Sequence, residues 1–208
     1  MRCERSHRPA LHEPSTEVMS RSAPNLRLVP SVPDPAEIAS LEPADVSLEV
    51  LYERYASYVG AVASRLLGRA GEVEDVVQDV FALAVKGLRR REEAHEIKGW
   101  LAKVTVRRCL RQLRLRRIWA IVDLAADPSY ERLAEPSAGP EERQLVSEVY
   151  RALDSVPARE RVAWTLRHVE GESLEEVAAL CDCSLATAKR RIASAHEKVK
   201  LRLEGRGR

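Results

Sequence analysis

Two groups of cationic side chains at helical spacing are the residues of this sequence best suited to bind an anion. Near the C-terminus, three cations and a serine follow two small residues: Ala186, Thr187, Lys189, Arg190, Arg191 and Ser194. Small side chains let a helix end approach the edges of bases, and the following cations can reach phosphates or guanine edges. A solvated basic helix end would show the same pattern, because short helix pairs also occur in proteins that bind no DNA.

The second cationic group lies near the middle of the chain, at steps of four, four and three residues: Lys103, Arg107, Arg111 and Arg114. These side chains share one helix face, which Arg108, Arg116 and Arg117 widen, and no acidic residue occurs between Glu96 and Asp123. Unpaired like charges on one face destabilise a helix, so we expect an anion to neutralise them. With Trp100 near its start, the stripe suits the backbone and stacked bases of an opened strand. A solvated face, or pairing with an acidic segment, would also explain it.

A helix-turn-helix positions the C-terminal group. The segment Ser173-Leu174-Glu175-Glu176 is a capping box, which predicts a helix from Ser173 to about Cys181. Asp182-Cys183-Ser184 predicts a turn, and Ser184 caps a further helix with a regular apolar edge: Leu185, Ala188, Ile192, Ala195 and Val199. Before this pair, apolar spacing predicts two more helices, which end at Pro157 and Gly171.

Three helices are predicted to position the middle group. Apolar residues recur at three- and four-residue steps over 48–67 and 73–88, and a third segment runs from Ile97 to about Trp119. We expect these helices to form one small bundle. The second helix has an acidic outer face with Glu74, Asp75, Gln78 and Asp79, which is either solvated or left for a protein partner.

Composition predicts an all-α protein. Aromatic residues make up 4% and there are nine glycines, which favours helices over sheet. The 34 Lys and Arg against 32 Asp and Glu leave a formal charge of +2, which excludes a uniformly basic coat. We expect five segments: a disordered tail at 1–46, a helical domain at 47–120, an acidic flexible linker at 121–142, a helix-turn-helix domain at 143–204 and a short tail at 205–208. The sequence has no apolar stretch like that of a membrane span or signal peptide, so we expect a cytoplasmic protein.

The remaining reactive residues form no recognisable site. Cys181 and Cys183 have no matching second pair, so we interpret them, with Cys3 and Cys109, as small apolar residues and expect no metal. The five histidines are scattered, no glycine-rich phosphate loop follows a strand, and no nucleophile lies in a known motif. We therefore expect neither an enzyme nor a cofactor.

Four segments of the chain resemble the extracytoplasmic-function (ECF) sigma factors of bacterial RNA polymerase. Residues 72–81, EVEDVVQDVF, are similar to the signature of the second conserved region, and residues 99–117 resemble the helix that follows it. Residues 156–178 resemble the fourth region, and Thr187-Ala188-Lys189-Arg190-Arg191-Ile192 stands where the family has T-V-K-S-R-L. The resemblance covers about 48–119 and 143–203, in the family's order.

This resemblance implies a non-enzymatic protein that binds core RNA polymerase and directs promoter recognition, DNA melting and transcription initiation. Region 2 would dock on the polymerase through Asp75, Gln78 and Asp79. It would hold the minus-ten element with Trp100, Lys103, Arg107, Arg108, Arg111 and Arg114. Region 4 would read the minus-thirty-five element with the C-terminal group, Ala186, Thr187, Lys189, Arg190, Arg191 and Ser194. The implied partners are core polymerase, promoter DNA and an anti-sigma factor, with no membrane.

Departures from the family pattern bear on the detail. Arg107 and Arg111 replace the usual Asn and Asp, so we assign them strand or phosphate contacts, and Glu172 stands where the family has Leu. An acidic linker between two basic helices would also let the free protein fold on itself and mask its DNA surfaces. The alternatives from other classes are a stand-alone helix-turn-helix regulator and an RNA-binding or anti-sigma-like protein.

Overall fold

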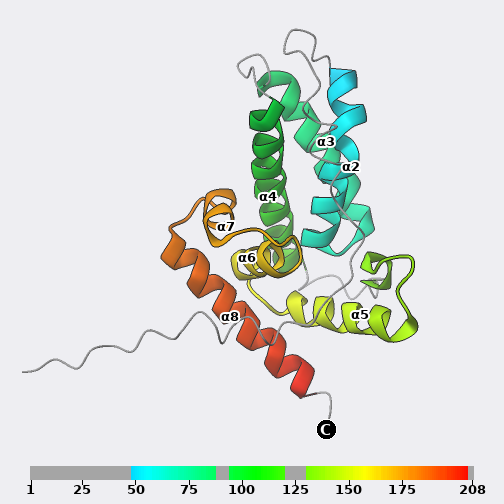
Figure 1. The fold of residues 1–208 in the computed structure, drawn as a ribbon, viewed down its shortest axis with the longest axis vertical. Helices are drawn as coiled ribbons and strands as arrows, with labels where there is room; N and C mark the ends of the chain where they lie inside the picture. The colour runs from blue at the N-terminus through cyan, green and yellow to red at the C-terminus, as the bar shows by residue number, and fades with distance from the viewer. Residues whose placement is uncertain (1–47, 88–93, 120–129, 206–208) are drawn as a thin grey trace, which may run out of the picture.

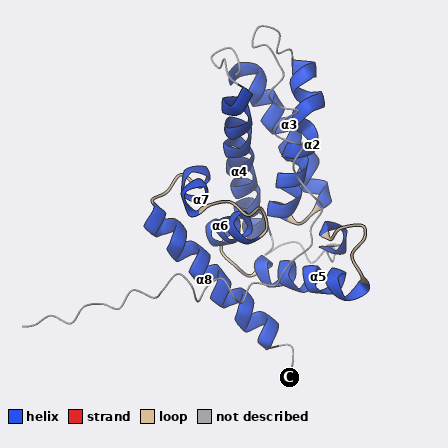
Figure 2. Ribbon diagram, viewed as in Figure 1, coloured by secondary structure: helices blue, strands red, loops and turns tan. Residues whose placement is uncertain are grey.

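The first domain is an upright bundle of three helices, as the apolar spacing predicted. In this computed structural model the described residues are 48–87, 94–119 and 130–205, and the bundle consists of α2 (Leu48–Leu67), α3 (Ala70–Gly87) and α4 (Ala94–Trp119) (Figure 1). The predicted tail at 1–46, residues 206–208 of the predicted tail at 205–208, and residues 121–129 of the predicted linker lie outside the described residues. Among the described residues the elements of secondary structure are all helices, which confirms the predicted all-α fold (Figure 2).

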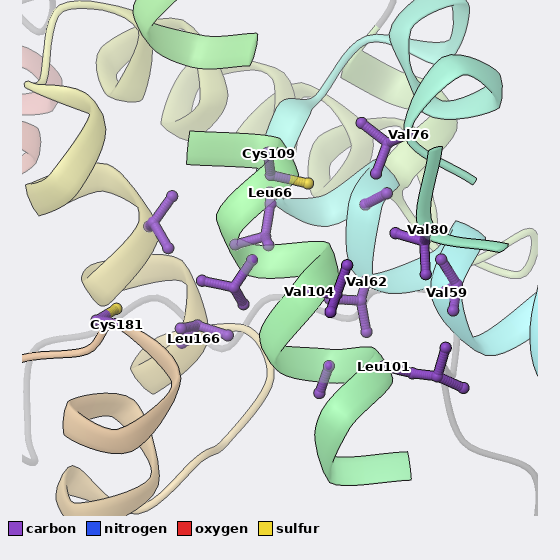
Figure 3. Packing of buried hydrophobic residues seen from close by; sticks show 14 of the residues in the cluster. Val59, Val62, Leu66, Val76, Val80, Leu101, Val104, Cys109, Leu166 and Cys181 are labelled. Carbon is purple, nitrogen blue, oxygen red and sulfur yellow. The ribbon is translucent and has the colours of Figure 1, made fainter. Parts of the chain in front are cut away.

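The bundle forms because each helix contributes one apolar stripe. Figure 3 shows Val59, Val62 and Leu66 of α2 beside Val80 of α3 and Val104 of α4. All five side chains are buried. On the other side of α4, buried residues of the second domain continue the same cluster, among them Leu166 and Cys181. The two domains therefore share one continuous core.

The second domain consists of α5 (Pro140–Asp154), α6 (Ala158–His168), α7 (Leu174–Leu180) and α8 (Leu185–Glu204). The predicted capping box is present at α7: Ser173 Oγ accepts from the Glu176 amide at 3.1 Å, and the Glu176 carboxylate accepts from the Ser173 amide at 2.8 Å. Ser184 Oγ caps α8 by accepting from the Thr187 amide. Asp182 has a positive φ of 52° in the turn between them. The helix-turn-helix is thus confirmed.

The second half of the predicted linker is folded onto the second domain. Tyr130–Leu133 forms a short 3-10 helix, η4, and the Tyr130 ring is fully buried and stacks on Tyr150 with ring centroids 5.5 Å apart. The Tyr130 hydroxyl donates to Asp154. Acidic residues dominate this segment in the sequence, but one tyrosine and one leucine supply enough apolar surface to fix it. Pro140 at the first position of α5 further favours order there.

Hydrogen bonds from the second domain cap the C-terminal end of α2. The last carbonyls of a helix lack partners within it. Here Arg161 of α6 donates to the carbonyls of Leu66 and Leu67 at 3.2 and 2.9 Å, and the Tyr150 hydroxyl donates to the carbonyl of Arg65 at 2.9 Å. Because these donors lie in the second domain, the end of α2 is completed only when the domains are in contact.

Ion pairs reinforce the same junction. Arg65 of α2 pairs with Glu170, which follows α6, and their side chains are only 6% and 7% exposed. Arg161 also pairs with Asp154 at 2.7 Å. In the parts of the chain that the structure describes, no helix is long and apolar enough to cross a membrane.

Candidate nucleic-acid interface

The cationic stripe of α4 lies mainly on its solvent face. Arg107, Arg111 and Arg114 are exposed, whereas Lys103 and Arg108 are half-buried. Two of these cations meet acidic side chains of neighbouring elements. Arg108 Nη1 lies 3.2 Å from the Asp79 carboxylate of α3, and Arg107 Nη2 lies 3.5 Å from the Asp182 carboxylate in the turn before α8. Exposed pairs of this kind contribute little stability, so the stripe stays available to an anion.

Two residues predicted to belong to the α4 surface are tied into the fold. Trp100 is half-buried and packs against the shared core. Arg116, which the sequence placed on the widened stripe, donates to the Leu67 carbonyl at 3.1 Å and to the Glu72 carboxylate at 2.6 Å. Arg116 is thus a structural residue that helps to cap α2. The sequence offered no sign of this role, because its partners lie more than forty residues away.

The start of α8 presents the second cationic group. Ala186, Lys189 and Arg190 are exposed, while Thr187, Arg191 and Ser194 are half-buried. Thr187 Oγ1 lies 2.9 Å from Ser184 Oγ and so completes the cap of the helix. Ser194 Oγ donates to the Glu160 carboxylate of α6 at 3.0 Å, which directs this side chain toward the domain interior. The exposed cations therefore offer the freest contact surface on this helix.

The acidic face of α3 adjoins the cationic stripe of α4. Asp75, Gln78 and Asp79 are all exposed, as is Glu74 beside them. Because Asp79 pairs with Arg108, the two faces meet along one edge of the bundle. One side of the first domain thus carries an acidic and a basic surface side by side.

The sequence did not single out the charged residues that join the domains. Arg65 and Glu170 are each buried, and Glu172 lies half-buried nearby. Burial, with the neighbouring carboxylates of Glu176 and Glu170, raises the pKa of Glu172 to about 7. One signal was present: Arg65 interrupts the apolar stripe of α2, where a cation needs a partner.

The cysteines form part of the core. Cys109 and Cys181 are buried, and burial raises the pKa of the Cys181 thiol to about 11. Cys183 is half-buried and packs against the same cluster. All three thiols are free, and Cys3 lies outside the described residues.

Matches to known families fall on both domains. The family model of sigma-70 region 2 matches residues 51–118, and that of sigma-70 region 4 matches residues 147–199. The chain is 30% identical over 162 residues to the ECF RNA polymerase sigma-E factor of Escherichia coli strain K12, covering 74% of this chain and 84% of that protein. It is 29% identical over 150 residues to the ECF sigma factor SigE of Mycolicibacterium smegmatis, covering 70% of this chain and 57% of that protein.

A solved structure shares the fold. The sigma factor RpoE of Bartonella quintana, in complex with the anti-sigma factor NepR, matches with a TM-score of 0.54 and 24% identity, over 75% of this chain and 94% of that chain. The chain has two helical domains, each with an exposed basic helix, and the second contains a helix-turn-helix. These features define the class as an all-helical transcription factor. The chain belongs to the ECF family of RNA polymerase sigma factors. It is therefore a regulator of transcription initiation that acts with core RNA polymerase on promoters.

Proposed function

We propose that this sigma factor divides its work among three surfaces. The exposed acidic face of α3, with Asp75, Gln78 and Asp79, docks on core RNA polymerase. The α4 stripe, with Lys103, Arg107, Arg108, Arg111 and Arg114, holds the minus-ten element, and Trp100 supports it from the core edge. The start of α8 reads the minus-thirty-five element, chiefly through Ala186, Lys189 and Arg190, with Thr187, Arg191 and Ser194 beside them.

The observation that carries this assignment is the pairing of acidic and basic faces on adjacent helices of the first domain. Docking through α3 would bring the neighbouring α4 stripe to the DNA that the polymerase holds. Guanidinium groups along α4 suit the phosphates of an opened strand, which is held mainly by charge. The exposed start of α8 supports the minus-thirty-five assignment, because the second helix of a helix-turn-helix enters the major groove by its N-terminal residues.

Partners and location follow from the family. We place the protein in the cytoplasm with the polymerase, and we assign it no catalytic residue. We also infer an anti-sigma partner, because the structural relative was solved in complex with one. A stand-alone regulator is less well supported, since it would leave the α4 stripe and the acidic α3 face without a role.

Run-off transcription with purified core polymerase tests the function directly. The template is the DNA upstream of this protein's own gene, with co-elution of protein and polymerase measured in parallel. We expect a discrete transcript only when the protein is added. Absence of both transcript and co-elution would contradict the proposal, whereas co-elution alone would point to a different promoter.

Charge reversal on α8 tests the minus-thirty-five surface. We expect Arg190→Glu with Arg191→Glu to weaken promoter binding and to leave binding to core polymerase unchanged. Lys200→Glu with Arg202→Glu is a matched control, because both residues are exposed on the last turns of the same helix. Loss of the polymerase complex in the α8 variant would contradict the assignment of surfaces.

Charge reversal on α3 tests the docking face. Asp75→Lys with Asp79→Lys should abolish co-elution with core polymerase. The single variant Asp75→Lys leaves the ion pair between Asp79 and Arg108 in place, so any loss of co-elution in this variant reports docking and not the loss of that pair. Glu131→Lys with Glu141→Lys is the matched control, because it changes the net charge by the same amount as Asp75→Lys with Asp79→Lys but at exposed sites of the second domain. Wild-type affinity of the α3 variant for core polymerase would show that the docking face is wrong.

A further inference from the structure

An open cleft lies where the two domains meet, lined by the end of α4, the first turn of α6 and the start of α8. Figure 1 shows how these three helices lie relative to one another. Its volume is about 550 Å³, which is within the range of clefts that bind small molecules. The charged side chains that line it are five arginines and one glutamate: Arg114, Arg117, Arg159, Arg190, Arg191 and Glu160.

The glutamate does not neutralise these arginines. Its carboxylate already accepts from Ser194 Oγ at 3.0 Å and from Lys198 Nζ at 2.5 Å. Within the described ranges, none of the five guanidinium groups forms a hydrogen bond or ion pair. Five like charges around one hollow repel each other, so the cleft favours an anion that can contact several of them.

The type of cation indicates the type of anion. Guanidinium groups are planar forks that match the oxygens of a phosphate in bidentate pairs, which makes arginine the preferred residue for phosphate recognition. A chain of phosphates places several such oxygens within one small volume. The first turn of α6 faces the same hollow and adds to the positive potential that the arginines set up.

We propose that this cleft binds a small oligophosphate, either inorganic or attached to a nucleoside, and that the bound anion fastens the two domains together. Arg114 and Arg117 belong to α4 of the first domain, whereas Arg159, Arg190 and Arg191 belong to α6 and α8 of the second. The site is therefore complete only while the domains are in contact. An anion that contacts both sets stabilises that contact by its own binding free energy.

Bound anion and promoter exclude each other, a consequence that rests on the proposed function. Arg114, Arg190 and Arg191 belong to both the cleft and the proposed DNA surfaces. Promoter elements centred near positions ten and thirty-five are about 25 base pairs apart, or about 85 Å at about 3.4 Å per base pair. Domains that touch through α4 and α6 cannot span that distance. Binding of the anion itself does not depend on the proposed function.

Calorimetric titration of the full chain with sodium tripolyphosphate, at constant ionic strength, tests the site. We expect one saturable site per chain. Arg159→Gln and Arg117→Gln, on opposite sides of the junction, should each weaken binding about fivefold or more, since each removes one guanidinium group that can pair with phosphate oxygens. Titration with ATP in the absence of magnesium distinguishes the two sources: tighter binding than tripolyphosphate assigns the site to a nucleotide, and equal or weaker binding assigns it to an inorganic chain.

Matched variants separate the cleft from general charge attraction. Arg132→Gln removes the same charge from an exposed site on η4 and should leave tripolyphosphate binding unchanged. Equal weakening by Arg132→Gln and Arg159→Gln, or the absence of a saturable site, would overturn the proposal. If Arg159→Gln weakens tripolyphosphate binding and Arg117→Gln does not, the anion does not contact both domains, and the proposal that it fastens them together is wrong.

DNA provides the last comparison. Arg159 lies outside both proposed DNA surfaces, so Arg159→Gln should bind a twelve-residue single-stranded oligonucleotide as the wild type does. If oligonucleotide and tripolyphosphate binding fall equally in this variant, the cleft is a DNA backbone site and the proposal is wrong. In run-off transcription, Arg159→Gln should match the wild type without anion and resist inhibition by tripolyphosphate. A wild type that neither supports transcription nor co-elutes with core polymerase, yet binds tripolyphosphate in the cleft, would count against the proposed function alone.

Discussion

Gly68, directly after α2, occupies a position that no other residue fits. Its φ is +72°, and a Cβ atom there would lie 2.6 Å from Tyr130 Cε1 and 3.0 Å from Tyr150 Cδ1. Both rings are buried, so neither can move away without disturbing the core. The residue thus lets the end of one domain approach two aromatic rings of the other.

Gly68→Ala should therefore lower the free energy of unfolding by about 2 kcal/mol, from left-handed backbone strain and steric conflict together. Urea unfolding measures this loss. Gly71→Ala is the matched control, because a Cβ atom at Gly71 would meet no neighbouring atom within 4 Å and alanine is the better helix former in α3. Equal stability of the two variants would contradict the close approach at Gly68.

His168 makes the second domain sensitive to acid. Its ring lies between Trp164 and His196, with centroids 4.9 and 5.6 Å away. Burial, with the neighbouring charges of His196 and Arg167, lowers the pKa of His168 to about 4. The unfolded chain takes up this proton near pH 6.5, so stability is lost as the pH falls from there toward 4.

We expect His168→Phe to reduce the loss of stability between pH 7 and pH 5. Urea midpoints of variant and wild type at both pH values measure the difference, because other titrating groups contribute equally to both proteins. His196→Phe, which removes the neighbouring ring, should reduce the loss less. A pH dependence identical to that of the wild type in His168→Phe would show that this ring does not control it.

At the scale of elements, α6 joins the domains through one buried arginine. Arg161 is 2% exposed and donates to two carbonyls of α2 and to Asp154. Removing one partner of a buried charged network leaves the others unsatisfied, which is far more costly than removing an exposed pair.

Arg161→Ala should accordingly cost about 3 kcal/mol of unfolding free energy. Arg161→Lys should recover part of this loss, because an ammonium group cannot donate in a fork to two carbonyls. Arg167→Ala serves as control, since Arg167 is exposed and donates only to the Glu172 carbonyl among the described residues. A loss below about 1 kcal/mol for Arg161→Ala would mean that the α2 carbonyls find water instead.

The elements that could be predicted are those with local causes. Apolar spacing predicted α2, α3 and α4, and the capping box at Ser173 predicted the start of α7, because both signals lie within a few residues. The exposed cations of α4 and α8 follow from the same helical spacing. The order of Tyr130 and the role of Arg161 could not be predicted, since their partners lie 24 and about 95 residues away.

At the scale of the whole molecule, we predict that Glu172 makes the contact between the domains depend on pH. The residue follows α6 and lies close enough to Lys98 of α4 to interact with its charge, and burial, helped by the carboxylate of Glu172, raises the pKa of Tyr58 of α2. Glu170 and Glu176 are the acidic neighbours of Glu172.

Because the pKa of Glu172 is raised to about 7, its protonated form favours the folded, closed arrangement. This contribution is complete below the ordinary carboxyl pKa of about 4.5 and is lost as the pH rises through 7. Glu172→Gln should therefore be more stable than the wild type at pH 8, with a smaller advantage at pH 6.

Hydrogen exchange at the last turn of α2, which the second domain caps, reports domain contact most directly. At pH 8, after correction for the intrinsic exchange rate, these amides should be less protected in the wild type than in Glu172→Gln. Glu175→Gln, an exposed neighbour on α7, should behave like the wild type. If Glu172→Gln and the wild type keep the same protection at both pH values, ionisation at this position does not separate the domains.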